Sequence, residues 1–528
     1  MAPGESQDIE VVTTAIHAQP DNKTRRYDRQ LRLWAATGQH ALETSRILVL
    51  SSSATATSIM KNLVLPGIGH FTLLDSTITT ARDAGNNFFL AGPDSVGKHR
   101  AQEAVTLLGE LNDGVEGSAD VRSVHDVLES DPAYFKSFSL VISHNLDSPT
   151  VEKLSHLLWT DPLSPMLIVV RSAGFLADFY IQFHEHDIIE SHTETAPSLR
   201  IDKPFPSLLE HALSLDLPNM DITDHGHIPY VVILVRVLED WKRSHNGLLP
   251  QTYAEKQAFK AALRDLKRKP DEENFDEAEA QAYRAWTTTG VPSDVAQLFT
   301  LLPTTAESST PSSTFHTLLR ALQKFTELDD PPHVLPLSST LPDMKADTSS
   351  YVHLQTLYKI RADEERAIFF DLLGKNPDID KGVVETFVKN AHAIRVLRGR
   401  RWGEFDADKE AIASAVAGYP RETASHLALS ALFNLTSSGT VPPTADVLLA
   451  EVQRIVGPGI ELPEKELTDA IGELARAPTS DLPNVAAFLG GLVAQEAIKM
   501  ITKQYVPING YCVVDLVDTW TGVIGTPA

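Results

Sequence analysis

The sequence contains one turn that is laid out to bind a phosphate group but lacks the residues that would bind it. This turn, residues 51–56, connects the apolar segment 46–50 to the amphipathic segment 54–65, and a second apolar segment then ends in Asp75. A strand, a tight turn, a helix and an acid about 20 residues later are typical of dinucleotide and ATP sites. The turn is therefore the candidate nucleotide site of this chain.

Glycine is missing at the three positions of the turn where a phosphate site needs it. Those positions hold Ser51, Ser53 and Ala56, and each Cβ atom crowds the path by which backbone N–H groups approach a phosphate. Two interpretations are open: a serine-lined nucleotide loop, or a structural relic that binds no nucleotide. The need for glycine favours the relic, so we expect no cofactor to bind to this chain.

Short apolar segments alternate with amphipathic ones around this turn. Expected strands cover 46–50, 70–75, 138–143, 165–170 and 511–516, and expected helices cover 25–38, 54–65, 98–112, 151–158 and 484–502. This alternation predicts an α/β fold with a doubly wound, mostly parallel Rossmann-like sheet. Between these segments helical periodicity dominates, from about residue 204 to residue 478. Further expected helices there cover 231–241, 253–266, 277–287, 315–328, 350–373 and 385–395.

The same patterns predict three regions. Residues 1–22 are expected to form a flexible tail, and residues 23–175 and 480–528 together an α/β domain. Residues 176–479 are expected to form a large, mainly helical insertion into that domain.

Composition and charge exclude several classes of protein. The chain of 528 residues has a net charge of −24, which argues against nonspecific binding to nucleic acid or to an anionic membrane. Its single cysteine, Cys512, allows neither an intrachain disulfide nor a cysteine-rich zinc site, and we expect no metal site. The N-terminus has no secretory signal pattern, and no apolar run approaches the roughly 20 residues that span a bilayer. We expect a cytoplasmic or nuclear protein.

Four segments together resemble the ubiquitin-activating enzyme family and its bacterial sulfur-carrier adenylyltransferase relatives. They are 26–34 (RYDRQLRLW), 61–69 (KNLVLPGIG), Gly97-Lys98 and 488–499 (FLGGLVAQEAIK). Within that family, four further segments are similar to regulatory subunits of neddylation-activating enzymes: 83–89 (DAGNNFF), 199–206 (LRIDKPFP), 270–275 (PDEENF) and 341–344 (LPDM). The resemblance implies an adenylation-type domain interrupted by the counterpart of a catalytic-cysteine domain.

This chain departs from active members of the family at the residues that handle ATP. Active members have a Mg²⁺-binding Asp where this chain has Thr77, and an Arg-Gln pair where it has Asn86 and Asn87. Asp75 and Lys98 match family residues and remain as remnants. The insertion also lacks the cysteine that carries the modifier in thioester-forming members. The resemblance therefore implies a non-catalytic subunit, with ATP and Mg²⁺ bound by a partner subunit.

One residue of the resemblance could still take part in chemistry. In the bacterial relatives an N-terminal arginine reaches the ATP of the neighbouring subunit, and the matching residue here is Arg29. A guanidinium suits this role because it is always charged and binds phosphate oxygens in a bidentate manner. The alternative is a solvated arginine on an amphipathic helix.

The resemblance also implies the partners. They are a catalytic subunit in an obligate heterodimer, a ubiquitin-like neddylation modifier whose binding cleft this chain would help to form, and a conjugating enzyme that acts through the complex. Three alternatives are an autonomous adenylyltransferase or oxidoreductase with an unusual loop, a subunit of the related sumoylation-activating enzyme, and a scaffold that contributes to no active site.

Overall fold

The structure is a computed structural model that describes residues 22–192, 196–302, 313–331, 333–374, 379–437 and 443–527. The described chain forms two compact units. One, the α/β unit, consists of residues 20–188 and 396–528, and the other, the helical unit, consists mainly of residues 189–395. The tail predicted over residues 1–22 lies outside the described residues, except for Asn22.

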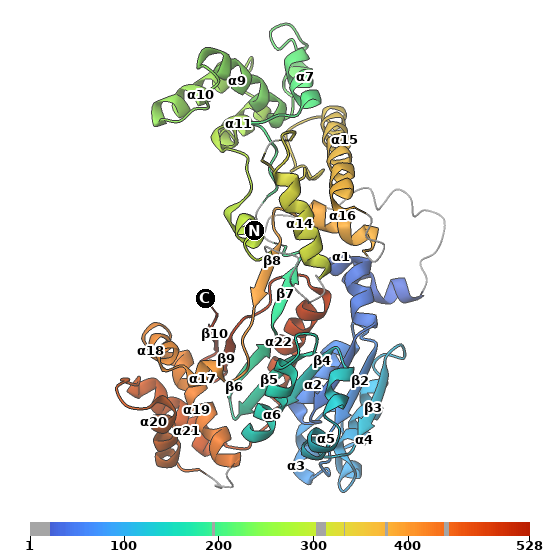
Figure 1. The fold of residues 1–528 in the computed structure, drawn as a ribbon, viewed down its shortest axis with the longest axis vertical. Helices are drawn as coiled ribbons and strands as arrows, with labels where there is room; N and C mark the ends of the chain where they lie inside the picture. The colour runs from blue at the N-terminus through green and yellow to red at the C-terminus, as the bar shows by residue number, and fades with distance from the viewer. Residues whose placement is uncertain are drawn as a thin grey trace. The chain divides into compact units, whose positions relative to one another are not determined.

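The α/β unit is built on an eight-stranded sheet of order β10-β9-β6-β5-β4-β1-β2-β3 (Figure 1). The five strands from β3 to β5 in this order are parallel, whereas β6, β9 and β10 pair in antiparallel fashion. The strands are β1 (Arg46–Leu50), β2 (His70–Leu74), β3 (Glu116–Asp120), β4 (Leu140–His144), β5 (Met166–Ala173), β6 (Leu176–Gln182), β9 (Tyr511–Asp515) and β10 (Trp520–Ile524). The predicted α/β, mostly parallel fold is confirmed.

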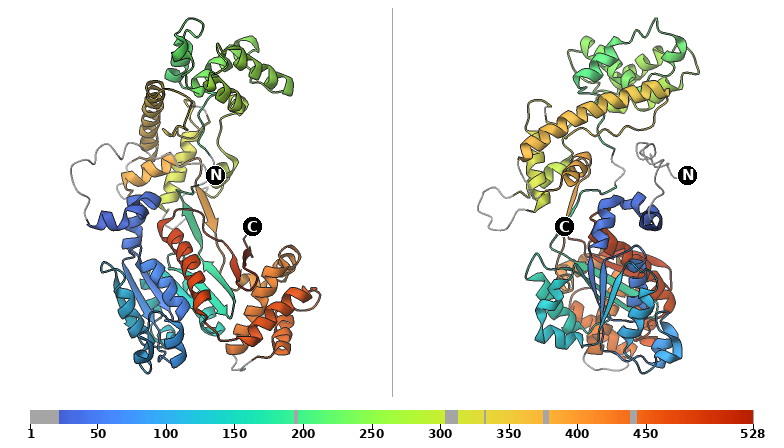
Figure 2. Two further views of the ribbon diagram at one scale, coloured as in Figure 1. Left: turned by 180° about the vertical axis from the view of Figure 1, so that it is seen from behind. Right: turned by 90° about the vertical axis from the view of Figure 1, so that its right-hand side faces the viewer.

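Successive residues of each strand contribute to opposite faces of the sheet, and helices cover both faces (Figure 2). On β1, Ile47 and Val49 join a core cluster with α2, α4 and α22, whereas Leu48 and Leu50 join one with α6, α19, α20 and α21. The helices of this unit are α1 (Asn22–Glu43), α2 (Ala54–Val64), α3 (Ala81–Asn86), α4 (Arg100–Gly109), α5 (Val124–Ser130), α6 (Ser148–Trp159), α17 (Glu404–Ala407), α18 (Lys409–Gly418), α19 (Pro420–Ser437), α20 (Ala445–Val456), α21 (Glu464–Arg476) and α22 (Pro483–Thr502).

The α/β unit is larger than the sequence predicted. The predicted insertion, 176–479, includes strand β6 and the helices α17 to α21, all of which belong to the α/β unit. Strand β6 pairs with both β5 and β9, and α19 packs its buried face in the same core as these strands. The structure therefore places the inserted unit at residues 189–395. Helical periodicity marks helices but does not reveal which core they join, and this explains the different boundaries.

The helical unit contains α7 to α16 and confirms most of the predicted helices. Helices predicted over 277–287 and 385–395 differ: the first is interrupted between α11 and α12, and the second ends at Lys389, before strand β8. The helices are α7 (Pro206–Ser214), α8 (Ile222–His225), α9 (Tyr230–Ser244), α10 (Tyr253–Asp265), α11 (Glu273–Ala280), α12 (Tyr283–Trp286), α13 (Ser293–Phe299), α14 (Thr314–Thr326), α15 (Thr348–Leu373) and α16 (Lys381–Lys389). Strands β7 (Glu185–Ile188) and β8 (Arg395–Arg398) form a two-stranded sheet where the chain passes between the units.

Helices α2 and α22 pack in direct contact through a glycine. A Cβ atom added to Gly490 would lie 2.8 Å from the backbone of Ser58 on α2, closer than van der Waals contact allows. The next residue, Gly491, would place a Cβ atom in open space. The two glycines of this motif therefore differ in kind: Gly490 permits the helix crossing, whereas Gly491 lies on the exposed side of α22.

A buried network of charged side chains connects the sheet to α19. Arg171 on β5 donates to the carboxylate of Asp178 on β6 from Nε at 2.8 Å and from Nη2 at 2.5 Å. The ring of His426 on α19 joins two carboxylates, with Nδ1 2.8 Å from Asp178 and Nε2 2.7 Å from Asp406. The hydroxyl of Tyr511 on β9 donates to Asp406 at 3.0 Å. Burial alone would lower the pKa of His426, but Asp406 and Asp178 outweigh it and raise this pKa, so two cations balance two anions.

We expect His426→Gln to lower the free energy of unfolding by about 3–5 kcal/mol, because Asp406 loses its cationic partner and Asp178 keeps only Arg171. The contribution of His426 is complete below the pKa of an unfolded histidine, about 6.5. It is lost as the pH rises through the raised pKa of the folded residue. Urea unfolding should therefore show that the free energy of unfolding falls with increasing pH in the wild type, and that it falls less in H426Q. The control is His125→Gln, at an exposed histidine; equal pH dependence in H426Q and the wild type would contradict the assignment.

We expect Gly490→Ala and Gly491→Ala to have opposite effects on the isolated chain. The first should lower the free energy of unfolding by about 1–3 kcal/mol, because its Cβ atom meets the backbone of α2. The second should raise it by up to about 1 kcal/mol, because alanine favours a helix over glycine. Thermal and urea unfolding measure both changes, and similar effects of the two substitutions would contradict the close crossing.

Candidate functional site

The predicted phosphate turn forms the beginning of α2, directly after β1. Ser53 is the N-cap residue, and its Oγ accepts the N–H of Ala56 at 3.1 Å. Ala56 is fully buried. Ser51 and Ser53 line a cavity of about 450 Å³. The elements of a nucleotide cleft are thus in place, with side chains at the positions where a phosphate site has glycine.

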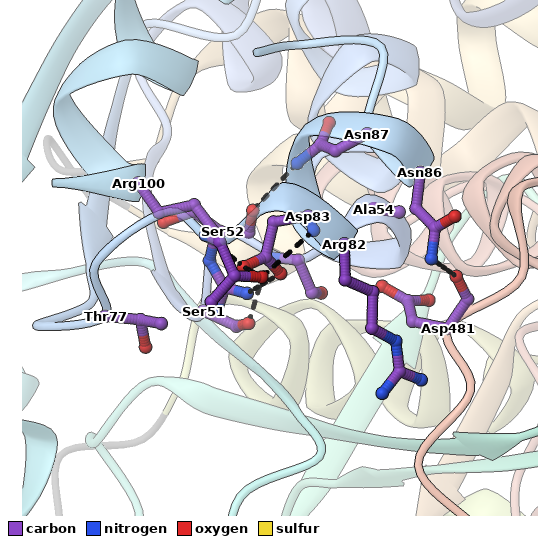
Figure 3. A network of polar contacts seen from close by, with 12 residues as sticks. Ser51, Ser52, Ala54, Thr77, Arg82, Asp83, Asn86, Asn87, Arg100 and Asp481 are labelled. Atoms are coloured by element: carbon purple, nitrogen blue, oxygen red, sulfur yellow. Dashed lines mark hydrogen bonds and ion pairs between the residues drawn. The ribbon is translucent and has the colours of Figure 1, made fainter. Parts of the chain in front are cut away.

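An arginine held between two aspartates occupies one side of this cleft (Figure 3). Arg100, in the first turn of α4, donates to Asp75 from Nε at 3.0 Å and from Nη2 at 2.8 Å, and from Nη1 to Asp83 at 3.0 Å. Asp75 also accepts the backbone N–H of Ser52 at 2.8 Å. Burial alone would raise the pKa of Asp75, but Arg100 and the hydrogen bonds from Thr77 outweigh it and lower this pKa. The charge of Arg100 is therefore balanced within the chain.

A second internal carboxylate lies at the N-terminus of α2. Asp481, in the segment between α21 and α22, accepts the hydroxyl of Thr55 at 2.6 Å and its backbone N–H at 3.3 Å. The segment is held on the other side by Arg82, which donates to the backbone oxygen and the hydroxyl of Thr479. Unpaired N–H groups at a helix N-terminus attract anions. Here the anion is a side chain of the same protein.

The two asparagines at the positions of the Arg-Gln pair hold the cleft together. Asn87 donates to the backbone oxygen of Ser52 at 3.0 Å and accepts the hydroxyl of Thr57 at 2.9 Å. Asn86 donates to the backbone oxygen of Asp481 at 3.3 Å (Figure 3). Both side chains therefore bond to the chain itself.

A neutral histidine completes the lining of the cavity. His144, at the end of β4, lies 2.7 Å from Ser53 Oγ through Nδ1 and 2.9 Å from Ser172 Oγ through Nε2. Burial lowers the pKa of His144. Asp83 and Asp481 line the cavity together with Arg82 and Arg100, so two carboxylates offset the two cations that a triphosphate would otherwise meet.

Neither remnant of the predicted site, Asp75 or Lys98, lines the cavity. Asp75 is buried behind Arg100, whereas Lys98 is half-exposed, pairs with Glu103 at 3.4 Å and is not among the residues that line the cavity. Thr77 is exposed and donates its backbone N–H to Asp75 at 2.9 Å. Among the described residues, no group of three or more histidine, cysteine or acidic side chains is placed to hold a metal ion.

Several residues of the cleft were not identified from the sequence. Arg100 could have been found, because it is an arginine at the beginning of a predicted helix that faces the phosphate turn. Asp481 gives no such signal, since it is 426 residues away from Thr55 along the chain. Only the fold brings these two residues together.

Arg29, the predicted trans residue, is exposed on α1. Among the residues that the structure describes, it makes no hydrogen bond or ion pair. Two other arginines of the same helix are paired: Arg26 with Asp113, and Arg32 with Asp28. The side chain of Arg29 is therefore available to bind a group outside this chain.

We expect Asp481→Ala to lower the free energy of unfolding by about 1–2 kcal/mol, because it removes a charged cap from α2. It should also expose the helix N-terminus to anions from solution. Inorganic phosphate should then raise the melting temperature of D481A more than that of the wild type.

Asp469→Ala, at an exposed position of α21, is the matched control, because it removes the same charge away from the cleft. An equal response of D481A and D469A to phosphate would show that Asp481 does not take the place of an anion.

Comparison with known proteins finds relatives that are similar over most of the chain. Residues 27–154 match the ThiF family. The NEDD8-activating enzyme E1 regulatory subunit of Xenopus laevis is 35% identical, over 92% of this chain and 96% of its own length. The NEDD8-activating enzyme E1 regulatory subunit AXL of Arabidopsis thaliana is 32% identical, over 95% and 98%. The NEDD8-activating enzyme E1 regulatory subunit of Saccharomyces cerevisiae is 26% identical, over 92% of this chain and 96% of its own length.

These similarities span both units and confirm the resemblance found in the sequence motifs. The chain belongs to the family of NEDD8-activating enzyme E1 regulatory subunits.

Proposed function

We propose that this chain is the non-catalytic subunit of a heterodimer in which the other subunit adenylates the C-terminus of a ubiquitin-like modifier. One observation carries the proposal: the chain's own carboxylates pair with Arg100 and with the N-terminus of α2 in its nucleotide cleft, whereas Arg29 is exposed and unpaired among the described residues. The names of the relatives support NEDD8, or its counterpart, as the modifier.

The chemistry of adenylation explains this division of labour. A carboxylate attacks the α-phosphate of ATP and pyrophosphate leaves, so the transition state needs Mg²⁺ and cations around the phosphates. In this proposal the partner subunit binds ATP and Mg²⁺, and Arg29 reaches its phosphates across the interface. A guanidinium suits this contact because it keeps its charge and matches phosphate oxygens in geometry.

The thioester step also belongs to the partner in this proposal. The only cysteine, Cys512, lies in strand β9, and burial raises the pKa of its thiol to about 12. A buried thiol with so high a pKa supplies almost no thiolate, which is the nucleophile in thioester formation. The helical unit contains no cysteine, and we propose that it helps to form the cleft that receives the modifier.

The exposed side of α22 supports a protein partner. Residues 487, 488, 491 and 495 form one exposed face of this helix, and 42% of Phe488 is exposed. Among the described helices, α22 alone is long and apolar enough to span a membrane by composition, yet half of that apolar stretch is buried inside the protein. A helix that buries one face in the core and exposes a large apolar side chain on the other fits packing against a second subunit.

We expect Arg29→Ala to lower ATP–pyrophosphate exchange by the heterodimer on the order of 10²-fold or more, because it removes a cation from the phosphates in the transition state. Assembly with the catalytic subunit, measured by size-exclusion chromatography, should not change, because Arg29 makes no hydrogen bond or ion pair among the described residues.

The control is Arg32→Ala, which removes the same charge from the same helix, three residues away. Wild-type exchange by R29A would exclude the trans role. Tight binding of ATP by this chain alone, measured by calorimetry, would instead favour an autonomous enzyme.

A further inference from the structure

Within the part of the chain that the structure describes, the segment of α1 that carries Arg29 buries little of its surface. Between residues 24 and 33 only Tyr27 is buried, with 6% of its surface exposed. Non-helical backbone at Trp34 and Ala35 separates this part from the remainder of α1, so the later turns of the helix do not fix its direction. The direction of this arm, defined here as residues 24–33, therefore depends on Tyr27 and the residues around it.

Asn112 holds Tyr27 through a side-chain amide whose nitrogen and oxygen each make two hydrogen bonds. Its Nδ2 donates to the hydroxyl of Tyr27 and to the backbone oxygen of Val64, both at 2.9 Å. Its Oδ1 accepts from Arg26 at 2.7 Å and from the N–H of Gly114 at 3.2 Å. Asn112 is itself 97% buried, with 3% of its surface exposed. It thus ties the arm to the C-terminal end of α2.

Gly67 provides the space that the ring of Tyr27 occupies. A Cβ atom at this position would lie 2.5 Å from the hydroxyl oxygen of Tyr27. The φ angle of Gly67 is also +87°, in the left-handed region that favours glycine. Tyr27 belongs to the RYDRQ segment and Gly67 to the PGIG segment, so two motifs that are distant in the sequence meet here.

The geometry of a helix connects this attachment to Arg29. Residues two positions apart point about 200° from one another around a helix, and hence to nearly opposite sides. Because Tyr27 faces the protein, Arg29 must face away from it. Loss of the contact between Tyr27 and Asn112 would leave the arm without a fixed rotation, so Arg29 would no longer have one direction.

We propose that Tyr27, Asn112 and Gly67 form a clasp that sets the direction of Arg29 toward the phosphates bound by the partner subunit. Asn112 and Tyr27 are then positioning residues, which act on the reaction only through Arg29. The inference rests on the proposed trans role of Arg29 and adds to it the part of this chain that determines where the guanidinium lies.

A double-mutant cycle in the heterodimer tests the clasp. We expect Asn112→Ala to lower ATP–pyrophosphate exchange about 10-fold, less than Arg29→Ala, because a loosely held cation reaches the phosphates for only part of the time. The rate of ATP–pyrophosphate exchange by the double variant R29A/N112A should be no lower than that of R29A, since Asn112 acts only through Arg29. Amide hydrogen exchange over residues 24–33 should become faster in N112A.

Two further variants separate positioning from folding. Tyr27→Phe keeps the ring against Gly67 but loses the hydroxyl, so it should give a smaller loss than N112A with normal assembly, and it replaces N112A if that variant does not assemble. Asp113→Asn removes only the exposed ion pair with Arg26. The heterodimer with this substitution should show the ATP–pyrophosphate exchange rate of the wild type.

The outcomes distinguish the clasp from the trans role. Normal exchange by N112A and Y27F together with impaired R29A would overturn the clasp and leave the trans role standing. If Asn112→Ala lowered the exchange rate by the same factor in the wild-type and R29A backgrounds, the clasp would also be overturned, because Asn112 would then act independently of Arg29. Normal exchange by R29A would overturn both.

Discussion

The rest of the α/β unit depends on the close crossing of α2 and α22. The absence of a side chain at Gly490 lets the backbone of α2 approach this helix directly, and both helices bury their apolar residues in the core beneath. The crossing holds α2 at Ser58, near the middle of the helix. Its N-terminus then lies at Asp481, and the carbonyl oxygen of Val64 near its other end lies at Asn112. One rigid helix therefore positions both the closed cleft and the arm that carries Arg29.

The cleft combines the fold of a nucleotide site with carboxylates supplied by the chain itself. A helix N-terminus and a buried arginine both require an anion nearby, since an unbalanced charge or unpaired donor in such a place is costly. In an active nucleotide site the phosphates supply it. Here Asp481 meets the helix, and Asp75 and Asp83 meet Arg100. These carboxylates balance the helix N-terminus and Arg100 from within the chain.

The sequence predicts those features that depend on local pattern. The predicted strand 46–50 and the predicted helix 54–65 agree with β1 and α2 to within one residue, because apolar periodicity and the turn between them are local signals. Glycine replacement at Ser51, Ser53 and Ala56 likewise identifies the degenerate turn without a structure. For Asn86 and Asn87, the sequence reveals only that an Arg-Gln pair is absent. Their hydrogen bonds within the cleft become visible only in the structure.

Features that depend on contacts between distant segments could not be predicted in this way. Asp481 meets Thr55 across 426 residues, and α19 joins the sheet although its sequence resembles the helices of the other unit. Helical periodicity is the same in either core, so the boundaries of the insertion required the structure. The role of Gly67 also becomes visible only when Tyr27 is seen against it.

Asp481 has a consequence for how the stability of this subunit responds to its surroundings. A dissociable ligand stabilises a fold by an amount that rises with its concentration, through mass action. A carboxylate attached to the same chain is present at a constant and high effective concentration, independent of any metabolite. Under the proposed function, in which the partner subunit binds the ATP, the folded fraction of this subunit does not depend on the supply of nucleotide.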